Sequence, residues 1–108
     1  MDSNTKLMAL DLVLLSVLED RPAYGLEILE RIQARTGENY DFKEGSLYPA
    51  LHRMVKQGWL DSTWEESQKG GAPRRYYSLS APGKQALEQK KLEWARLRQA
   101  MDGLLGGV

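Results

Sequence analysis

The sequence contains no cysteine, which excludes a disulfide framework and any metal site built from thiolates. It also has no apolar run of the roughly 18 residues that a membrane-spanning helix needs. Residues 1–6 lack the charged start and the apolar core of a secretion signal. We therefore expect a cytoplasmic protein with no membrane contact, no metal and no cofactor.

The formal net charge is zero, because 15 Lys and Arg residues balance 15 Asp and Glu residues. Whole-domain basicity, the usual mark of a nucleic-acid binder, is therefore missing. The charge is nevertheless polarised, since residues 1–20 are mostly acidic and residues 69–98 mostly basic. A chain of 108 residues is expected to form one domain and to bury only about two-thirds of its unfolded surface, so part of its core should come from a partner.

Signals of catalysis are missing too. His52 is the single histidine, and no Ser or carboxylate stands at a spacing from it that suggests a catalytic pair. Glu65 and Glu66 are adjacent, so their side chains diverge on a hairpin, and no second carboxylate is placed to oppose them. No Gly-rich phosphate loop is present. We therefore do not expect an enzyme.

Hydrophobic periodicity predicts helices in the first half of the chain. Residues 7–18 are apolar almost all round, which is typical of a helix buried on most sides. A second helix begins at Tyr24 and Gly25 and stops at Gly37. Its apolar positions recur at spacings of three and four, and we expect the inward-facing residues to be Leu26, Leu29, Ile32 and, less strongly, Ile28.

A third helix follows a connector over residues 38–43 and ends at Gly58. Its start has two alternatives: with Ser46 as the N-cap, Pro49 lies in the first turn, whereas with a start near Glu44, Pro49 removes one intrahelical bond. The expected inner face is Leu47, Leu51, Met54 and Val55. The opposite face is small, polar and cationic, with Tyr48 on its flank, and it consists of Ser46, Pro49, His52, Arg53 and Lys56.

Residues 59–64 and 75–79 are short aromatic and β-branched or hydroxyl-rich runs, which predict a hairpin with a long tip. Lys69, Arg74 and Arg75 flank two glycines, Gly70 and Gly71, that keep the tip slim. Of the adjacent strand residues Tyr76 and Tyr77, Tyr77 is the expected core residue, because it shares a face with Leu79.

The last helix begins after Ser80 and carries an apolar stripe that requires a partner surface, formed by Leu87, Trp94, Leu97, Met101 and Leu104. Trp94 has two interpretations. It is either core or dimer seam, or one wall of an apolar pocket in which two copies of the ring sandwich a planar ligand.

A polar helix face followed by a basic hairpin favours DNA binding, because a narrow cationic helix fits a major groove about 12 Å wide. An ordinary solvated helix face and a solvated turn are the alternatives for each element alone. A protein of another class also fits: a winged-helix protein–protein interaction module that does not bind DNA. The two arginines beside the glycine tip favour DNA, since such a module does not need them.

The chain resembles the short PadR-family transcriptional regulators over about residues 7–102. Three segments carry the resemblance: Tyr24 and Gly25, residues 45–54, and residues 73–79. The resemblance implies a mainly α (α+β) fold: a winged helix-turn-helix over residues 1–80 with a two-stranded β-hairpin wing, and a long C-terminal dimerisation helix over residues 81–105. It implies a repressor that binds an inverted-repeat operator in double-stranded DNA as a homodimer, with Trp94 matching a Trp that stacks on planar ligands. Three features depart from the family pattern: the glycines that end the last helix early, the acidic Glu65 and Glu66, and the zero net charge.

Together these arguments give two sets of expected site residues. The expected DNA contacts are Tyr24, Ser46, Tyr48, Pro49, His52, Arg53, Lys56, Lys69, Gly70, Gly71, Arg74, Arg75 and Tyr76. The expected dimer interface is Leu10, Leu14, Leu87, Trp94, Leu97, Met101 and Leu104, and Trp94 is also the expected contact for a small aromatic effector.

Overall fold

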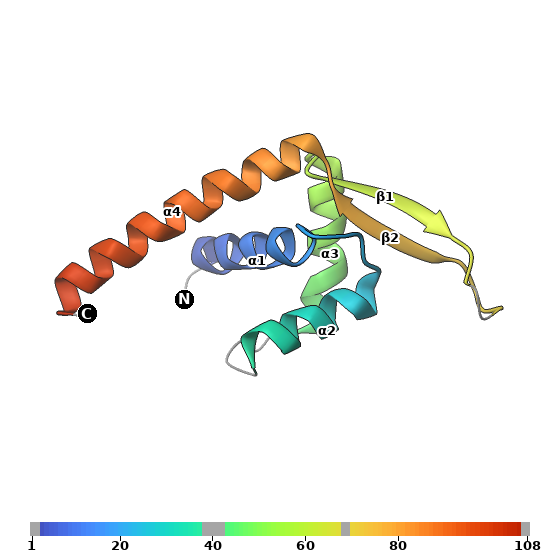
Figure 1. Ribbon diagram of the computed structural model, residues 1–108, viewed down its shortest axis with the longest axis horizontal. Coiled ribbons are helices and arrows are strands. Elements are labelled where there is room, and N and C mark those ends of the chain that lie inside the picture. The colour runs from blue at the N-terminus through green and yellow to red at the C-terminus, as the bar shows by residue number, and fades with distance from the viewer. Residues whose placement is uncertain (1–2, 38–42, 68–69, 107–108) are drawn as a thin grey trace.

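The computed structural model describes residues 3–37, 43–67 and 70–106. In chain order its elements are α1 (Ser3–Val17), α2 (Gly25–Thr36), α3 (Glu44–Lys56), β1 (Leu60–Glu65), β2 (Arg74–Leu79) and α4 (Ala81–Leu105). The first three helices gather beside the start of α4, and the β1–β2 hairpin projects from one end of the molecule while the rest of α4 projects from the other (Figure 1). The expected fold, a helical body with a two-stranded antiparallel hairpin and a long last helix, is confirmed.

The core lies where α1, α2, α3, the base of the hairpin and the start of α4 meet. Helix α1 supplies much of it, as its apolar circumference predicts, because it packs against both α2 and α4. The largest fully buried side chains are Leu14, Leu15, Leu18, Ile28, Leu47, Leu51, Met54, Leu60 and Leu87. Tyr77 is also buried, as expected, while Tyr76 is only half-buried.

Helix α2 corrects one expected core position. Leu26 is 55% exposed, whereas Ile28 is fully buried and Ile32 nearly so. Two positions apart on a helix differ by about 200° around its axis, so Leu26 and Ile28 cannot both face the core. The pair at positions 28 and 32, one turn apart, fixes the buried face. The C-terminal stop is confirmed, because Gly37 has a left-handed φ of 57° and its N–H donates to the Gln33 carbonyl.

Helix α3 begins at Glu44, which decides between the two alternatives for its start. Pro49 therefore lies inside the helix, and the Gly45 carbonyl lacks the N–H that another residue at position 49 would donate. Ala50 is buried beside Leu47 and Leu51, and Val55 is only half-buried.

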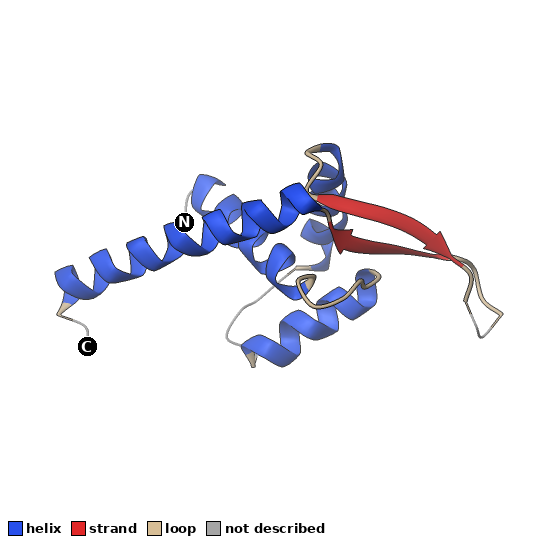
Figure 2. Cartoon of the chain, turned by 45° about the horizontal axis from the view of Figure 1, so that its top comes forward, coloured by secondary structure: helices blue, strands red, loops and turns tan. Residues whose placement is uncertain are grey.

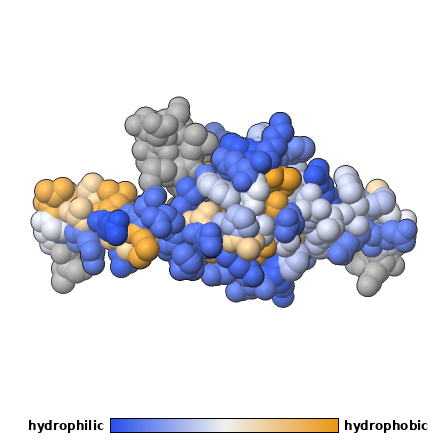
Figure 3. Space-filling model, turned by 90° about the horizontal axis from the view of Figure 1, so that it is seen from above, coloured by the Kyte–Doolittle hydropathy of each residue, from blue (hydrophilic) through white to orange (hydrophobic). Residues whose placement is uncertain are grey.

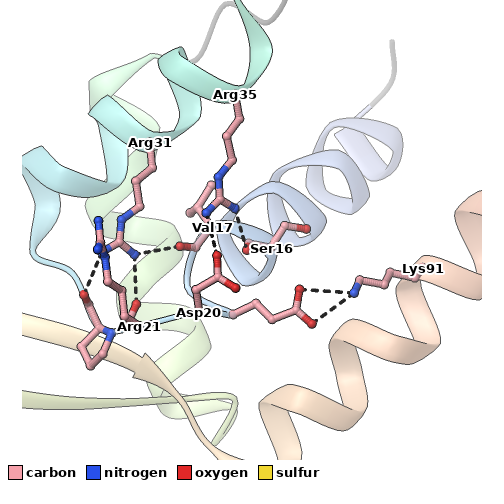
Figure 4. Close-up of polar contacts among 9 residues, drawn as sticks. Ser16, Val17, Asp20, Arg21, Arg31, Arg35 and Lys91 are labelled. Carbon is pink, nitrogen blue, oxygen red and sulfur yellow. Dashed lines mark hydrogen bonds and ion pairs between the residues drawn. The ribbon is translucent and has the colours of Figure 1, made fainter.

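Two arginines one turn apart on α2 hold the turn that follows α1 (Figure 4). The Arg31 guanidinium donates to the carbonyls of Val17, Arg21 and Pro22 at 2.9–3.0 Å. Arg35 donates to the Ser16 carbonyl and pairs with Asp20 at 3.0 Å. The last carbonyls of a helix lack intrahelical donors and carry partial negative charge, so cations stabilise them. These contacts fix α2 against the end of α1.

The hairpin is joined both to the start of α2 and to α4. Ala23 and Tyr77 exchange two backbone hydrogen bonds of 3.0 and 2.9 Å, so the residue before Tyr24 extends the sheet. At the other side, the Ser80 side chain caps α4 by accepting from the Gly83 N–H at 3.0 Å. A Cβ at Gly83 would lie 1.9 Å from the Trp59 carbonyl oxygen, so only glycine allows α4 to approach the hairpin this closely.

Candidate nucleic-acid interface

The outer face of α3 is the first candidate surface. Its side chains at Ser46, Pro49, His52 and Lys56 are exposed, while the opposite face is buried in the core. Tyr48 is 49% exposed and also contacts α2, because a Cβ at Gly25 would lie 2.4 Å from its hydroxyl oxygen. The absence of a side chain at Gly25 therefore lets α3 pack closely on the start of α2. This contact explains why position 25 is a glycine.

Arg53 departs from the expected arrangement. It does not lie free on the outer face: its guanidinium donates to both carboxylate oxygens of Asp11 on α1, and one of its nitrogens lies 3.4 Å from the Gln57 amide oxygen. The side chain is long enough to turn from the edge of the exposed face back to α1. A carboxylate inside the apolar run of residues 7–18 was the sequence signal for this contact, because a buried charge needs a partner.

The second candidate surface is the side of the hairpin nearest α2. The Arg74 guanidinium lies 4.5 Å above the centre of the Tyr24 ring, and Tyr24 meets Tyr76 edge to face at 5.4 Å. Arg74 is exposed, and the ring beneath it restricts its position while leaving its charge available to solvent. Tyr24, Tyr76 and Arg74 thus form one continuous stack from the start of α2 to the wing.

Arg75 lies on the opposite face of the hairpin and is half-buried. It donates to the Ser62 hydroxyl at 2.8 Å and lies 5.9 Å from the Trp64 ring and 5.7 Å from the Tyr77 ring. Burial raises the pKa of the Tyr77 phenol, and the charge of Arg75 opposes that rise. The two arginines are therefore not equivalent: Arg74 is presented to solvent, while Arg75 is partly used within the hairpin.

Sequence reasoning did not single out Trp64, which is 68% exposed on the Arg75 face of the hairpin. Alternation along β1 from the buried Leu60 places it on that face, beyond the part of the hairpin that the body covers. At the tip, Gly70 and Gly71 are exposed, and Gly70 has a φ of 77° that favours glycine. Lys69 lies outside the described residues.

The expected dimer residues fall into two groups. Leu14 and Leu87 are completely or almost completely buried within the single chain, and Leu10 is half-buried against the same core. These two buried leucines are therefore not surface residues, because α1 and the start of α4 already cover each other. By contrast, the distal part of α4 exposes Leu92, Trp94, Leu97, Met101, Leu104 and Leu105. Apolar side chains gather at this end of the molecule (Figure 3).

Within the described part of the chain, no group of three or more His, Cys, Asp or Glu residues could hold a metal ion. No helix among the same residues is long and apolar enough to cross a bilayer.

Comparison with known proteins gives a consistent result. The family model for the transcriptional regulator PadR-like family matches residues 14–89. A crystal structure of a PadR family transcription regulator from Clostridium difficile is 37% identical, with a TM-score of 0.76 over 88% of this chain and 96% of that one. A transcriptional regulator from Clostridium thermocellum is 30% identical, with a TM-score of 0.82 over 95% and 96%. Bacillus subtilis PadR in complex with operator DNA shares the fold, with 21% identity and a TM-score of 0.67 over 74% of this chain and 45% of that one.

Proposed function

Because this chain belongs to the PadR-like family of transcriptional regulators, which are not enzymes, we propose that it is a repressor that binds an inverted-repeat DNA operator as a homodimer. The observation that carries the proposal is the pairing of two surfaces: the exposed polar face of α3, and the exposed Arg74 stacked on Tyr24. The operator complex of Bacillus subtilis PadR, which shares the fold, supports a duplex DNA partner. Such a regulator acts in the cytoplasm, where it meets DNA.

In the proposed complex, α3 enters the major groove and presents its outer face to the base edges. His52 and Lys56 supply donors, and the small side chains at Ser46 and Pro49 let the helix approach the groove closely. Tyr48 completes this face. Arg53 is not a proposed base contact, because its guanidinium is already bonded to Asp11.

The wing is proposed to contact phosphates or the adjacent minor groove. Arg74 is the main contact, since its guanidinium is exposed and its position is restricted by Tyr24 and Tyr76. The slim tip at Gly70 and Gly71 lets the hairpin follow the DNA backbone. Arg75 contributes less, because it is half-buried and bonded to Ser62.

The homodimer is proposed to form through the exposed apolar face of distal α4, with Leu10 of α1 at the edge of the interface; that face consists of Trp94, Leu97, Met101 and Leu104. Exposed apolar side chains on one continuous helix mark a surface that a second copy can cover. A two-fold dimer reads half-sites about one helical turn apart, roughly 10 base pairs. Trp94, 54% exposed in the middle of this surface, is the proposed stacking wall for a planar aromatic effector that releases the repressor.

Selection from random duplex DNA, followed by salt titration of the selected site, tests the proposal. Arg74→Ala should flatten the log–log salt dependence by about 0.9 for each phosphate that the variant no longer neutralises. Arg96→Ala is the matched control, because it removes the same charge from an exposed position on the side of α4 opposite Trp94 and should leave the slope unchanged. A protein-interaction module would enrich no sequence and would give the same slope for both variants.

The same selected site tests α3. His52→Ala should lower the affinity for the selected site by about 1–3 kcal/mol while leaving random duplex binding nearly unchanged. Tyr48→Phe removes only the hydroxyl and preserves the ring beside Gly25. Equal losses on selected and random DNA would assign these residues to positioning and would contradict base reading by this face.

A further inference from the structure

A buried carboxylate joins three helices. Asp11, in the middle of the apolar helix α1, is only 6% exposed. Both of its oxygens accept from the Arg53 guanidinium of α3, and one of them lies 3.9 Å from the Lys90 ammonium of α4. The three elements that meet at this carboxylate are the first helix, the proposed DNA-reading helix and the helix with the proposed dimer surface.

The contact is reinforced from α4. The Lys90 side chain is only 20% exposed, and its ammonium lies 5.1 Å from the centre of the Trp59 ring. Trp59 lies three residues beyond the end of α3, and its N–H donates to the Met54 carbonyl near the end of that helix. Lys90 therefore lies near both the carboxylate that holds α3 and a residue whose backbone is hydrogen-bonded to the end of that helix.

The geometry of this cluster restricts orientation as well as distance. A guanidinium that meets a carboxylate through two nitrogens fixes the relative direction of the two side chains, and the low exposure of Asp11 keeps water from replacing either bond. The ion pair between Asp20 and Arg35 is different, because its carboxylate is 71% exposed and water competes for it.

We infer that Asp11 is a positioning residue that sets the angle of α3 relative to α1 and α4, and thereby the half-site spacing that the dimer accepts. The inference rests on the proposed function, since α4 carries the proposed dimer surface and α3 the proposed base contacts. In a two-fold dimer, any rotation of α3 against α4 occurs twice and changes the separation of the two reading helices. Arg53 acts here through Asp11 and does not read bases.

Duplexes that contain the selected half-site pair, with the spacer lengthened or shortened by one and two base pairs, test this inference. One base pair displaces a half-site by about 3.4 Å along the DNA axis. The wild-type protein should prefer one spacing by about tenfold, and Asp11→Asn should reduce that preference to about threefold or less while affinity for a single half-site stays within about threefold. Asp20→Asn, the same change at an exposed ion pair, should behave as wild type.

Two further variants cover a failure of Asp11→Asn to fold, which thermal unfolding would reveal. Arg53→Lys keeps the charge but loses the two-nitrogen geometry, so it should fold and show the same relaxed spacing. Asp11→Glu keeps a carboxylate and should retain more of the preference than Asp11→Asn.

The outcomes separate the inference from the proposed function. If the wild-type protein enriches no duplex, the proposed function fails, and the inference fails with it. If the wild-type protein binds DNA but shows no spacing preference, or if the variants lose affinity equally at every spacing, only the positioning role is overturned. Tighter binding with a steeper salt dependence in Asp11→Asn would also overturn it, because Arg53 would then be a DNA contact that Asp11 holds back.

Discussion

The two ends of α4 have the same kind of sequence and opposite surroundings. Near its start, Gly83 lies against the hairpin backbone and Leu87 is 1% exposed in the core. Toward its end, Leu97 and Met101 are more than 40% exposed, and Leu104 is 79% exposed. The helix continues well past the body, as Figure 2 shows.

The difference shows that an apolar stripe on one helix can serve two separate purposes. The first part of α4 completes the core of the single chain, because α1 covers it. The distal part has apolar residues at the same spacing, but they stay exposed in the single chain, so a partner is the surface that can remove them from water. The periodicity of the sequence is the same in both parts, and only the fold separates the core positions from the proposed interface.

The largest expected effect comes from placing charge on the distal part. Leu97→Lys together with Met101→Lys should convert the proposed dimer to a monomer, because two cations per chain would enter an apolar seam at a cost of about 3 kcal/mol or more, a hundredfold in affinity. Light scattering gives the mass directly. The body should stay folded, since neither side chain is buried in the core of the single chain.

Gln99→Lys is the control for that experiment, because it adds a cation on the opposite side of the same exposed helix. The control should keep the dimer mass. A double variant that also remains dimeric would refute the assignment of distal α4 as the interface.

The next-largest effect comes from replacing leucine by alanine near the start of α4 and, for comparison, near its end. Leu87→Ala should lower the free energy of unfolding by about 2–5 kcal/mol, the usual cost of a cavity in a core. Leu104→Ala should change it by less than about 0.5 kcal/mol, because that side chain is exposed. Both should be measured by urea denaturation in the monomeric Leu97→Lys, Met101→Lys background, so that dimer dissociation does not contribute. Equal losses of unfolding free energy in the two variants would contradict the assignment of Leu87 to the core and of Leu104 to an exposed surface.

Local signals explain why the element order was predictable from the sequence. Glycine at position 37, proline after Ser80 and the two glycines in the hairpin each act within a few residues, and the structure has its helix ends and turn at these places. The buried faces followed from periodicity for α3 and for β2. In α2, where apolar residues point in several directions around the helix, the periodicity predicted Leu26 as an inward-facing residue, although Ile28 is the buried one.

Long-range charge pairing could not be predicted in the same way. Arg53 and Asp11 are 42 residues apart, and a helical wheel gives the direction of Arg53 but not the reach of its flexible side chain. The contact of Tyr48 with Gly25 and the stack of Arg74 on Tyr24 likewise depend on how α2 packs, which no local pattern specifies. For the candidate site, sequence identified the elements, and the structure was needed to rank Arg74, Arg75 and Arg53.

Glycine substitutions extend the comparison along α4 with a smaller effect. Gly83→Ala should destabilise the protein by about 1–3 kcal/mol, because its Cβ would meet the Trp59 carbonyl and force α4 away from the hairpin. Gly103→Ala, in the distal part, should stabilise it by about 0.5–1 kcal/mol, since nothing lies within 4 Å and alanine favours a helix. Thermal unfolding of both variants measures the difference. A loss at Gly103 would show that the proposed partner packs closely there.

The smallest expected effect concerns Trp94, which lies in the distal part of α4. If a two-fold axis brings two copies of its ring together, a planar aromatic dye should insert between them and quench tryptophan fluorescence. Trp94→Phe should keep dye binding, measured by the fluorescence of the dye, because a smaller aromatic ring still stacks. Trp94→Ala should weaken binding by about 0.5–1.5 kcal/mol for each offset stack that it removes. Trp59 and Trp64 contribute a constant background in every variant. Dye binding that is as tight in Trp94→Ala as in the wild type would assign Trp94 to the dimer seam alone, and the effector would then have to bind elsewhere on the protein.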